Sequence, residues 1–241
     1  MITKLGYIRE LTRYPVKSMA GAKTASAFLG WHGLDGDRRF GLRRLKDKSA
    51  FPWLNASRFP QLLLYHPFGL DESTGEPLPT HVRTPAGAEV GLHSKELQSE
   101  IGDRWGADVE MMHLQHGIFD DAAISVINEA TIAGIGREAS LALDRRRFRA
   151  NILLETQDAE PFLEDGWIGG TLVFGDRDDG PAVTVTARDV RCMMINLDPE
   201  TAVQNAEVLR TVVRINSNHA GVYATVVRTG MLQVGDAVRL M

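Results

Sequence analysis

Short runs of strand-forming residues, each bounded by Gly, Pro or Asp, are the feature that most restricts the fold of this chain. Such runs occupy residues 61–65, 171–174, 183–186, 222–227 and 237–240. Many short strands at this spacing are typical of β-barrels. We therefore expect a mainly β fold with a few helices, in the α+β class.

Two segments show helical patterning instead. Leu97 and Ile101 lie four residues apart after Ser94, whose hydroxyl predicts an N-cap. Asn128 predicts the N-cap of a second helix that continues through Ile132. These two predicted helices are short, so we expect them to pack on the surfaces of sheets.

Composition and charge narrow the classes of protein. The 241 residues are 44% hydrophobic and 24% charged, which suits one globular domain or two closely packed ones. A net charge of −4 gives no general attraction to nucleic acid or to an acidic membrane. Charges interrupt the N-terminal residues before a signal region could form, and no apolar run reaches the roughly 18 residues of a membrane helix. The sequence predicts a cytoplasmic protein with no nucleic-acid or membrane partner, in which any anion site is local.

The chain has one cysteine, Cys192, and a lone thiol fits a reducing compartment. Cys192 directly follows a β-rich run, and the neighbouring Arg191 is a cation that favours the thiolate. A thiolate is a soft ligand that suits a heavy transition metal. The alternative is a buried cysteine packed with Met193 and Met194. The local sequence leaves both interpretations open.

Four arginines lie within residues 145–149 and are followed by Asn151. The planar donors of a guanidinium match a phosphate, and Asn151 could add hydrogen bonds. A solvated basic face explains such a run equally well. If a strand begins at Asn151, then Arg147, Arg149 and Asn151 share one face while Phe148 points to the other, which favours a binding site.

Two segments near the N-terminus could also meet a ligand. Pro15 fixes a turn that presents Lys17 and Ser18 together, and a cation beside a hydroxyl suits an oxyanion. The glycine-rich residues 30–36 precede Arg38 and can bring backbone close to a ligand. An ordinary surface turn is the alternative for each segment.

Other motifs do not fit their usual functions. The glycine pattern of residues 134–139 matches a dinucleotide fingerprint but follows a predicted helix instead of a strand. His113 and His116 are three residues apart, yet the rest of a zinc pattern is missing from the sequence. A Gly-x-Ser-x-Gly elbow for a hydrolytic serine is missing too.

Taken together, the motifs resemble the MOSC domain family, named after the C-terminal domain of molybdenum cofactor sulfurase. The resemblance is strongest to the amidoxime-reducing component type, which has an N-terminal β-barrel domain. The matching motifs, in order, are YPVKS at 14–18, GLDGDR at 33–38, FDD at 119–121, NEAT at 128–131, RFRAN at 147–151, RC at 191–192, DPET at 198–201, GVY at 221–223 and VGD at 234–236. They cover nearly the whole chain.

The resemblance implies a fold and a cofactor. It implies a MOSC β-barrel over residues 89–241, packed against a smaller N-terminal β-barrel-like subdomain over residues 1–88. It also implies a molybdenum–molybdopterin cofactor held between the two, and no dependence on pyridoxal phosphate.

The resemblance also assigns residues. It makes Cys192 the metal ligand and a catalytic residue. Asp120 and Asp121 match an acidic loop near the metal, where they would act as outer-sphere or proton-handling catalytic residues. The positions at which the family binds the pterin and its phosphate are here Lys17, Ser18, Arg38, Arg147, Arg149, Asn151 and Arg191. Ala150 stands where many relatives have proline.

The implied function is a molybdenum-dependent reductase of small N-hydroxylated or N-oxide-like molecules. Cys192 is assigned to molybdenum, so the chain has no cysteines left for an iron–sulfur relay, and electrons are expected from a separate flavoprotein, haem protein or iron–sulfur protein. The alternatives are a non-enzymatic carrier of the cofactor or of persulfide sulfur on Cys192, and a catalytically silent β-barrel interaction protein.

Overall fold

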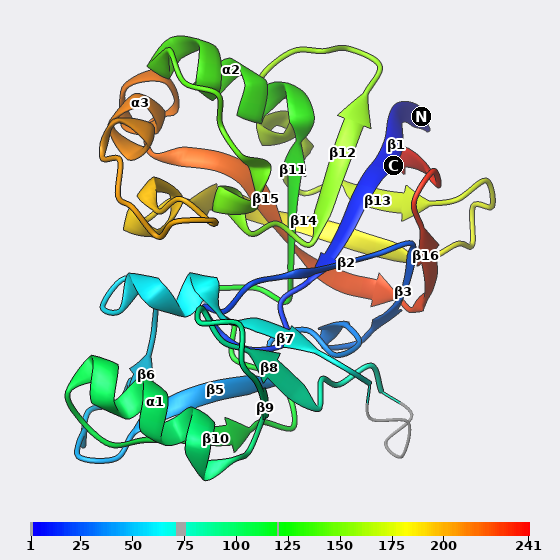
Figure 1. Cartoon of the computed structure of the whole chain (residues 1–241). Coiled ribbons are helices and arrows are strands. Elements are labelled where there is room, and N and C mark those ends of the chain that lie inside the picture. Colours follow the sequence, from blue (N-terminus) through cyan, green and yellow to red (C-terminus); the bar gives the residue numbers. More distant parts are fainter. Residues whose placement is uncertain (1, 71–75, 120) are drawn as a thin grey trace.

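Seven strands close into a barrel in the computed structural model, which describes residues 2–70, 76–119 and 121–241 (Figure 1). In order around the barrel they are β1 (Thr3–Arg13), β12 (Ile152–Thr156), β11 (Ile124–Asn128), β15 (His219–Arg228), β14 (Ala182–Val190), β13 (Thr171–Phe174) and β17 (Ala237–Leu240). Antiparallel pairing of β1 with β12 closes the ring, and β2 (Ala22–Thr24) extends the sheet from β1. The expected β-barrel is therefore confirmed.

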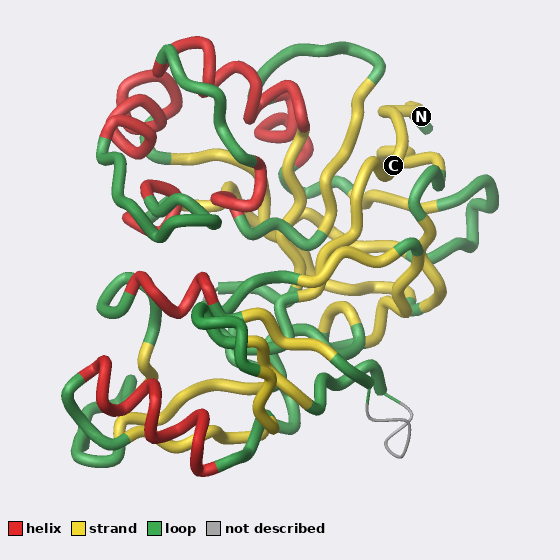
Figure 2. Tube along the Cα trace, in the orientation of Figure 1, coloured by secondary structure: helices red, strands yellow, loops and turns green. Residues whose placement is uncertain are grey.

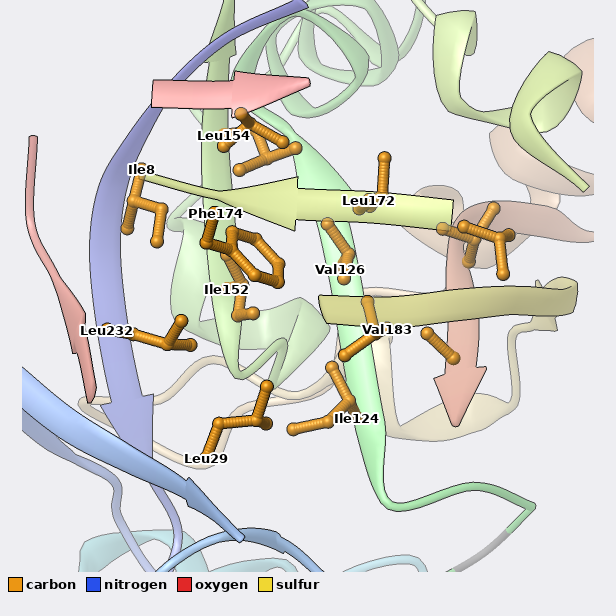
Figure 3. Close-up of a cluster of buried hydrophobic side chains, with 14 of the residues drawn as sticks. Ile8, Leu29, Ile124, Val126, Ile152, Leu154, Leu172, Phe174, Val183 and Leu232 are labelled. Atoms are coloured by element: carbon orange, nitrogen blue, oxygen red, sulfur yellow. The ribbon is translucent and has the colours of Figure 1, made fainter. Parts of the chain in front are cut away.

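Alternating apolar residues fill the barrel because successive side chains of a strand point to opposite faces. In β14, Val183 and Val185 are buried while Thr184 between them is partly exposed. Figure 3 shows such side chains pointing toward one another in the interior. Leu29 and Leu232 join this core from a small separate sheet of β16 (Gly230–Gln233), β3 (Ser26–Gly30) and β4 (Gly33–Leu34).

Two helices cover the outside of the barrel. The helices α2 (Glu129–Ala139) and α3 (Glu207–Asn216) pack on β11, β12 and β15, and Figure 2 shows them together on one side of the strands. Because α2 covers its outer face, β11 is buried along its whole length. The expected N-cap of α2 is confirmed, since the Asn128 side chain accepts a hydrogen bond from the Ala130 amide at 3.3 Å.

The smaller lobe has its own core between two three-stranded sheets and a helix. Its elements are β5 (Phe40–Arg44), β6 (Trp53–Leu54), β7 (His66–Phe68), β8 (His81–Arg83), β9 (Glu89–Gly91), α1 (Lys95–Trp105) and β10 (Val109–His113). Ser94 caps α1 as expected, accepting from the Leu97 amide at 3.2 Å. In the described part of the chain, no helix is both long enough and apolar enough to cross a membrane.

Neither lobe is a single continuous segment of the chain. Strand β1 belongs to the barrel, whereas α1 and β10 pack in the core of the smaller lobe. The division between residues 88 and 89 stays a prediction about domains. The barrel and the smaller lobe both contain residues from each side of it.

One strand prediction is wrong. Residues 61–65 lie mostly in the 3₁₀ helix η1 (Pro60–Leu64). Proline near the start of η1 has a backbone angle that suits a helical turn, and a short apolar run does not distinguish a strand from a buried helical segment. The strands expected at residues 171–174, 183–186, 222–227 and 237–240 are confirmed as parts of β13, β14, β15 and β17.

The glycines of the rejected dinucleotide pattern serve helix packing. Gly134 and Gly136 lie inside α2, where a Cβ atom would come within 2.7 Å of Pro161 and 2.8 Å of the Leu141 carbonyl oxygen. Glycine is required at both positions because neighbouring chain touches the helix backbone.

A buried carboxylate secures the start of α2. Glu164, in the 3₁₀ helix η3 (Leu163–Trp167), accepts hydrogen bonds from the Asn128 amide at 3.2 Å and the Thr131 hydroxyl at 2.9 Å. Burial raises the pKa of Glu164 to about 7, although these hydrogen bonds act in the opposite direction. The folded protein therefore binds a proton here more tightly than the unfolded chain does.

We expect a pH-dependent stability that Glu164→Gln removes. A raised pKa stabilises the fold fully below about pH 4.5, and this contribution is lost as the pH rises to about 7. The loss is on the order of 3 kcal/mol, because one pKa unit corresponds to about 1.4 kcal/mol. Urea unfolding of both proteins from pH 5 to pH 8 should show the variant gaining relative stability as the pH rises. Parallel stability curves would contradict this assignment.

Candidate functional site

A cavity of about 330 Å³ collects most of the residues expected to bind the cofactor. Those in its wall are Lys17, Ser18, Arg38, Arg147, Arg149 and Arg191, together with the expected catalytic residues Cys192 and Asp121. Asn55 and Ser57, from the loop after β6 in the smaller lobe, also line it and were not expected from the sequence. Asp120 lies outside the described residues.

Cys192 is exposed at this cavity. It follows β14 and stands at the N-cap of the 3₁₀ helix η4 (Met193–Asn196), where its side chain forms no capping hydrogen bond with the described residues. Met193 and Met194 are half-buried and pack against the core of the smaller lobe. The interpretation of Cys192 as a buried spectator is therefore wrong, and its thiol is accessible to a ligand.

Arg191 is held on three sides beside Cys192. Its Nε donates to the Ala220 carbonyl at 2.6 Å and its Nη1 donates to the Phe148 carbonyl at 2.8 Å. Its Nη2 lies 2.9 Å from Oδ2 of Asp189. Arg191 is buried, and these three contacts fix its guanidinium in the cavity wall.

Asp189 is a buried site residue to which the motifs assigned no role. It lines the cavity, and its Oδ2 also accepts a hydrogen bond from the Ser125 hydroxyl at 2.9 Å. Burial raises the pKa of Asp189, while the charge of Arg191 and the hydrogen bonds from Ser125 and Tyr223 oppose this shift. Its position next to the RC motif was a possible signal, but only the fold shows that it pairs with Arg191.

Gly221 leaves room for Arg191. Its φ of 81° lies in the left-handed region, and a Cβ atom there would come within 2.7 Å of the Val126 carbonyl and 3.1 Å of Nη2 of Arg191. These close contacts explain why the GVY motif has a glycine at position 221.

Asn151 lies behind the cavity wall and supports Arg38. It is 1% exposed, its Oδ1 accepts from Nη1 of Arg38 at 3.1 Å, and its Nδ2 donates to the Thr12 carbonyl at 3.2 Å. Arg38 also pairs with Asp37 and donates through Nη2 to the Arg149 carbonyl at 3.3 Å. Asn151 thus orients a cation of the wall without lining the cavity itself.

The arginine run does not continue a strand, so the expected alternation of its side chains is wrong. Residues 145–148 form the 3₁₀ helix η2 (Arg145–Phe148), because the Asp144 side chain caps it by accepting from the Arg146 amide at 2.8 Å. Arg149 then turns into the left-handed region with a φ of 51°. This turn divides the run between two places.

Some arginines of residues 145–149 belong to the binding site, and others form a basic face. Arg147 and Arg149 line the cavity, and Phe148 is buried in a core beneath it. Arg145 instead lines an outer hollow beside α2, where it pairs with Glu10 and Glu129. Part of the run is thus a partly exposed basic face and part belongs to the site.

The DPET motif secures Arg147. Oδ1 of Asp198 accepts hydrogen bonds from the amides of Glu200 and Thr201, both at 3.0 Å. Oδ2 of Asp198 lies 2.8 Å from Nη2 of Arg147, which also donates through Nη1 to the Asn196 carbonyl at 2.9 Å. A turn held by its own aspartate therefore positions one cation of the cavity wall.

Three residues of the wall have backbone angles that side chains rarely adopt. The φ values of Ser18, Arg38 and Arg149 are 68°, 50° and 51°. Each costs roughly 1 to 3 kcal/mol and persists only where surrounding contacts impose it, as at ligand sites. The backbone of the cavity wall is therefore strained at these three residues, and contacts with the surrounding fold hold it in place.

The wall is cationic and suits an anion beside a thiol. Five of its side chains are cations, and two, Asp121 and Asp189, are carboxylates. Lys17 is buried, and its ammonium lies 5.7 Å from the centre of the Phe51 ring. Among the described residues, no three His, Cys, Asp or Glu side chains group to hold a metal ion. A thiol beside five cationic side chains fits a metal that an anionic group carries to the site.

The MOSC domain model matches residues 95–239, more than half of the chain. No curated protein matches. The YuaD protein from Bacillus subtilis shares 14% identity over 100% of this chain and 96% of that chain, with a TM-score of 0.53, so the two have a similar fold. YiiM from Geobacillus stearothermophilus shares 16% identity over 50% of this chain and 55% of its own, with a TM-score of 0.35. By its family match, the chain belongs to the MOSC domain family.

Proposed function

We propose that this protein binds a molybdenum–molybdopterin cofactor and reduces small N-hydroxylated or N-oxide-like molecules. The observation that carries the proposal is the exposed thiol of Cys192 in a cavity wall with five cationic side chains. A soft thiolate suits molybdenum, and guanidinium groups match the phosphate of a pterin. Family membership supports the same cofactor.

The residues of the cavity wall would have two roles, cofactor binding and proton transfer. Cys192 would be the protein ligand of the metal, while Lys17, Arg38 and Arg149 would hold the phosphate. When bound, the cofactor supplies the two-electron chemistry. Asp121, an exposed carboxylate of the wall, would hold a proton near the oxygen that leaves the substrate as water. Asp120 would share this role.

Electrons would come from a separate cytoplasmic flavoprotein, haem protein or iron–sulfur protein. The single cysteine is committed to molybdenum, and the glycine pattern of residues 134–139 lies inside α2 rather than in a dinucleotide-binding turn. A net charge of −4 gives little long-range steering of association. Electron-transfer contacts are typically small, so we expect a transient complex.

Steady-state reduction of benzamidoxime is the test of this proposal. We expect turnover by molybdenum-replete protein with reduced viologen, and none with NADH or NADPH alone. Protein produced without the cofactor is the control. Robust turnover with a nicotinamide and no second protein would overturn the two-component model.

A carrier of the cofactor or of persulfide sulfur is the second candidate. The exposure of Cys192 and its lack of a capping bond with the described residues favour it, because a carrier must present its sulfur to another protein. Molybdenum-replete protein that shows no turnover with viologen, but whose Cys192 persulfide passes sulfur to an acceptor, would favour the carrier.

A further inference from the structure

Two arginines of the cavity wall share one aromatic ring. The guanidinium carbon of Arg149 lies 4.2 Å from the centre of the Tyr14 ring, and that of Arg38 lies 5.4 Å from it. Tyr14 is only 3% exposed. A buried ring attracts cations more strongly than an exposed one, because water does not compete for them.

The same tyrosine fixes the backbone that presents Arg38. The Tyr14 amide donates to Oδ1 of Asp37 at 2.6 Å, and the Arg38 amide donates to the Tyr14 carbonyl at 2.8 Å. Arg149 reaches the site from a segment more than 130 residues away and donates through Nη1 to the Met19 carbonyl at 2.8 Å. Tyr14 therefore stands where the two cation-bearing segments meet.

The phenol stays neutral at physiological pH. Burial raises the pKa of Tyr14 to about 12, although the charges of Arg149 and Arg38 act in the opposite direction. The attraction of the two guanidinium groups to Tyr14 is thus to the face of a neutral ring. This attraction offsets part of the repulsion between the two like charges.

We propose that Tyr14 is a positioning residue whose ring holds Arg38 and Arg149 together before an anionic ligand binds. This inference rests on the proposed function only for the identity of that ligand, the phosphate of the pterin. A preassembled cluster binds more tightly, because less side-chain freedom is lost on binding. The hydroxyl of Tyr14 is not required for this role, whereas the ring is.

Gly21 provides a second way to disturb the ring. A Cβ atom at this exposed glycine would lie 2.5 Å from Cε1 of Tyr14 and 2.8 Å from Cγ2 of Thr12. Gly21→Ala would therefore crowd the ring without removing it or any charge.

The test is calorimetric titration of full-length, cofactor-free protein with inorganic phosphate. Relative to wild type, we expect Tyr14→Leu to weaken phosphate binding about tenfold, Gly21→Ala to weaken it about threefold, and Tyr14→Phe to stay within about threefold. Tyr7→Leu is the matched control, since Tyr7 is an exposed aromatic residue beneath a cation, Lys4, outside the cavity wall. Its phosphate affinity should equal that of wild type.

Each result decides the proposal. Equal affinities of wild type and Tyr14→Leu, or a loss in Tyr14→Phe as large as in Tyr14→Leu, would overturn it, as would no measurable phosphate binding by wild type. If Tyr14→Leu does not fold, unchanged affinity in Gly21→Ala would overturn the proposal instead. The titration needs no molybdenum, so its failure can be told apart from failure of the reductase activity. Pterin content of cofactor-loaded protein should follow the same order.

Discussion

Replacing Cys192 with alanine should abolish turnover while leaving the fold intact. The side chain is exposed and forms no capping bond with described residues, so its loss should change the free energy of unfolding by no more than about 0.5 kcal/mol. The variant would lack the proposed protein ligand of the metal. We expect lower molybdenum content and a changed electron paramagnetic resonance signal in whatever metal remains.

Cys192→Ser is the informative companion. It keeps the size of the side chain but offers a harder oxygen ligand, so we expect metal to be retained in part with an altered signal and little activity. Thermal unfolding should give all three proteins similar midpoints. Full activity in Cys192→Ala would refute the ligand assignment.

Removing a cation of the cavity wall should have the next largest effect, on cofactor affinity. Arg149→Ala and Arg38→Ala each remove a charge that lines the cavity. A hydrogen bond to a charged group contributes about 1.5 to 3 kcal/mol, so each loss should weaken cofactor binding roughly ten- to a hundredfold. Pterin fluorescence of the oxidised cofactor, released from equal amounts of protein, measures this.

Arg145→Ala is the matched control, because it removes the same charge from the same run. Arg145 lies in the outer hollow, with its Nε 3.2 Å from Oε2 of Glu10, and it is not part of the cavity wall. Its pterin content should stay near that of wild type. Equal content in all three variants would mean that the whole run is a solvated face.

The barrel was predictable because its signals are local. Alternation and turn residues mark β14 and β15, and single side chains at Ser94 and Asn128 start two helices. The segment at residues 61–65 was not predictable in this way. Its apolar run has the length of a strand, and its helical turn depends on a proline and on packing with core residues that are distant in the sequence.

The site was predictable as a set of residues but not as an arrangement. Family motifs named the thiol and the cations, and the cavity wall brings most of them together. The contacts that orient them join distant segments, such as Arg38 with Asn151 across 113 positions and Ser125 with Asp189 across 64. The ring of Tyr14 beneath two arginines has no local signal, because Arg149 lies 135 positions later in the sequence.

The place of β1 in the barrel has a consequence for the order of folding. Tyr7 on β1 pairs with Ala237 on β17, 230 positions later, and β1 also pairs with β12. Contacts between such distant segments form slowly, because a long loop must close first. During synthesis β1 must wait for β17 to leave the ribosome before the ring can close. The ring of the barrel should therefore close late, and the proposed cofactor should be inserted only after translation of the barrel is complete.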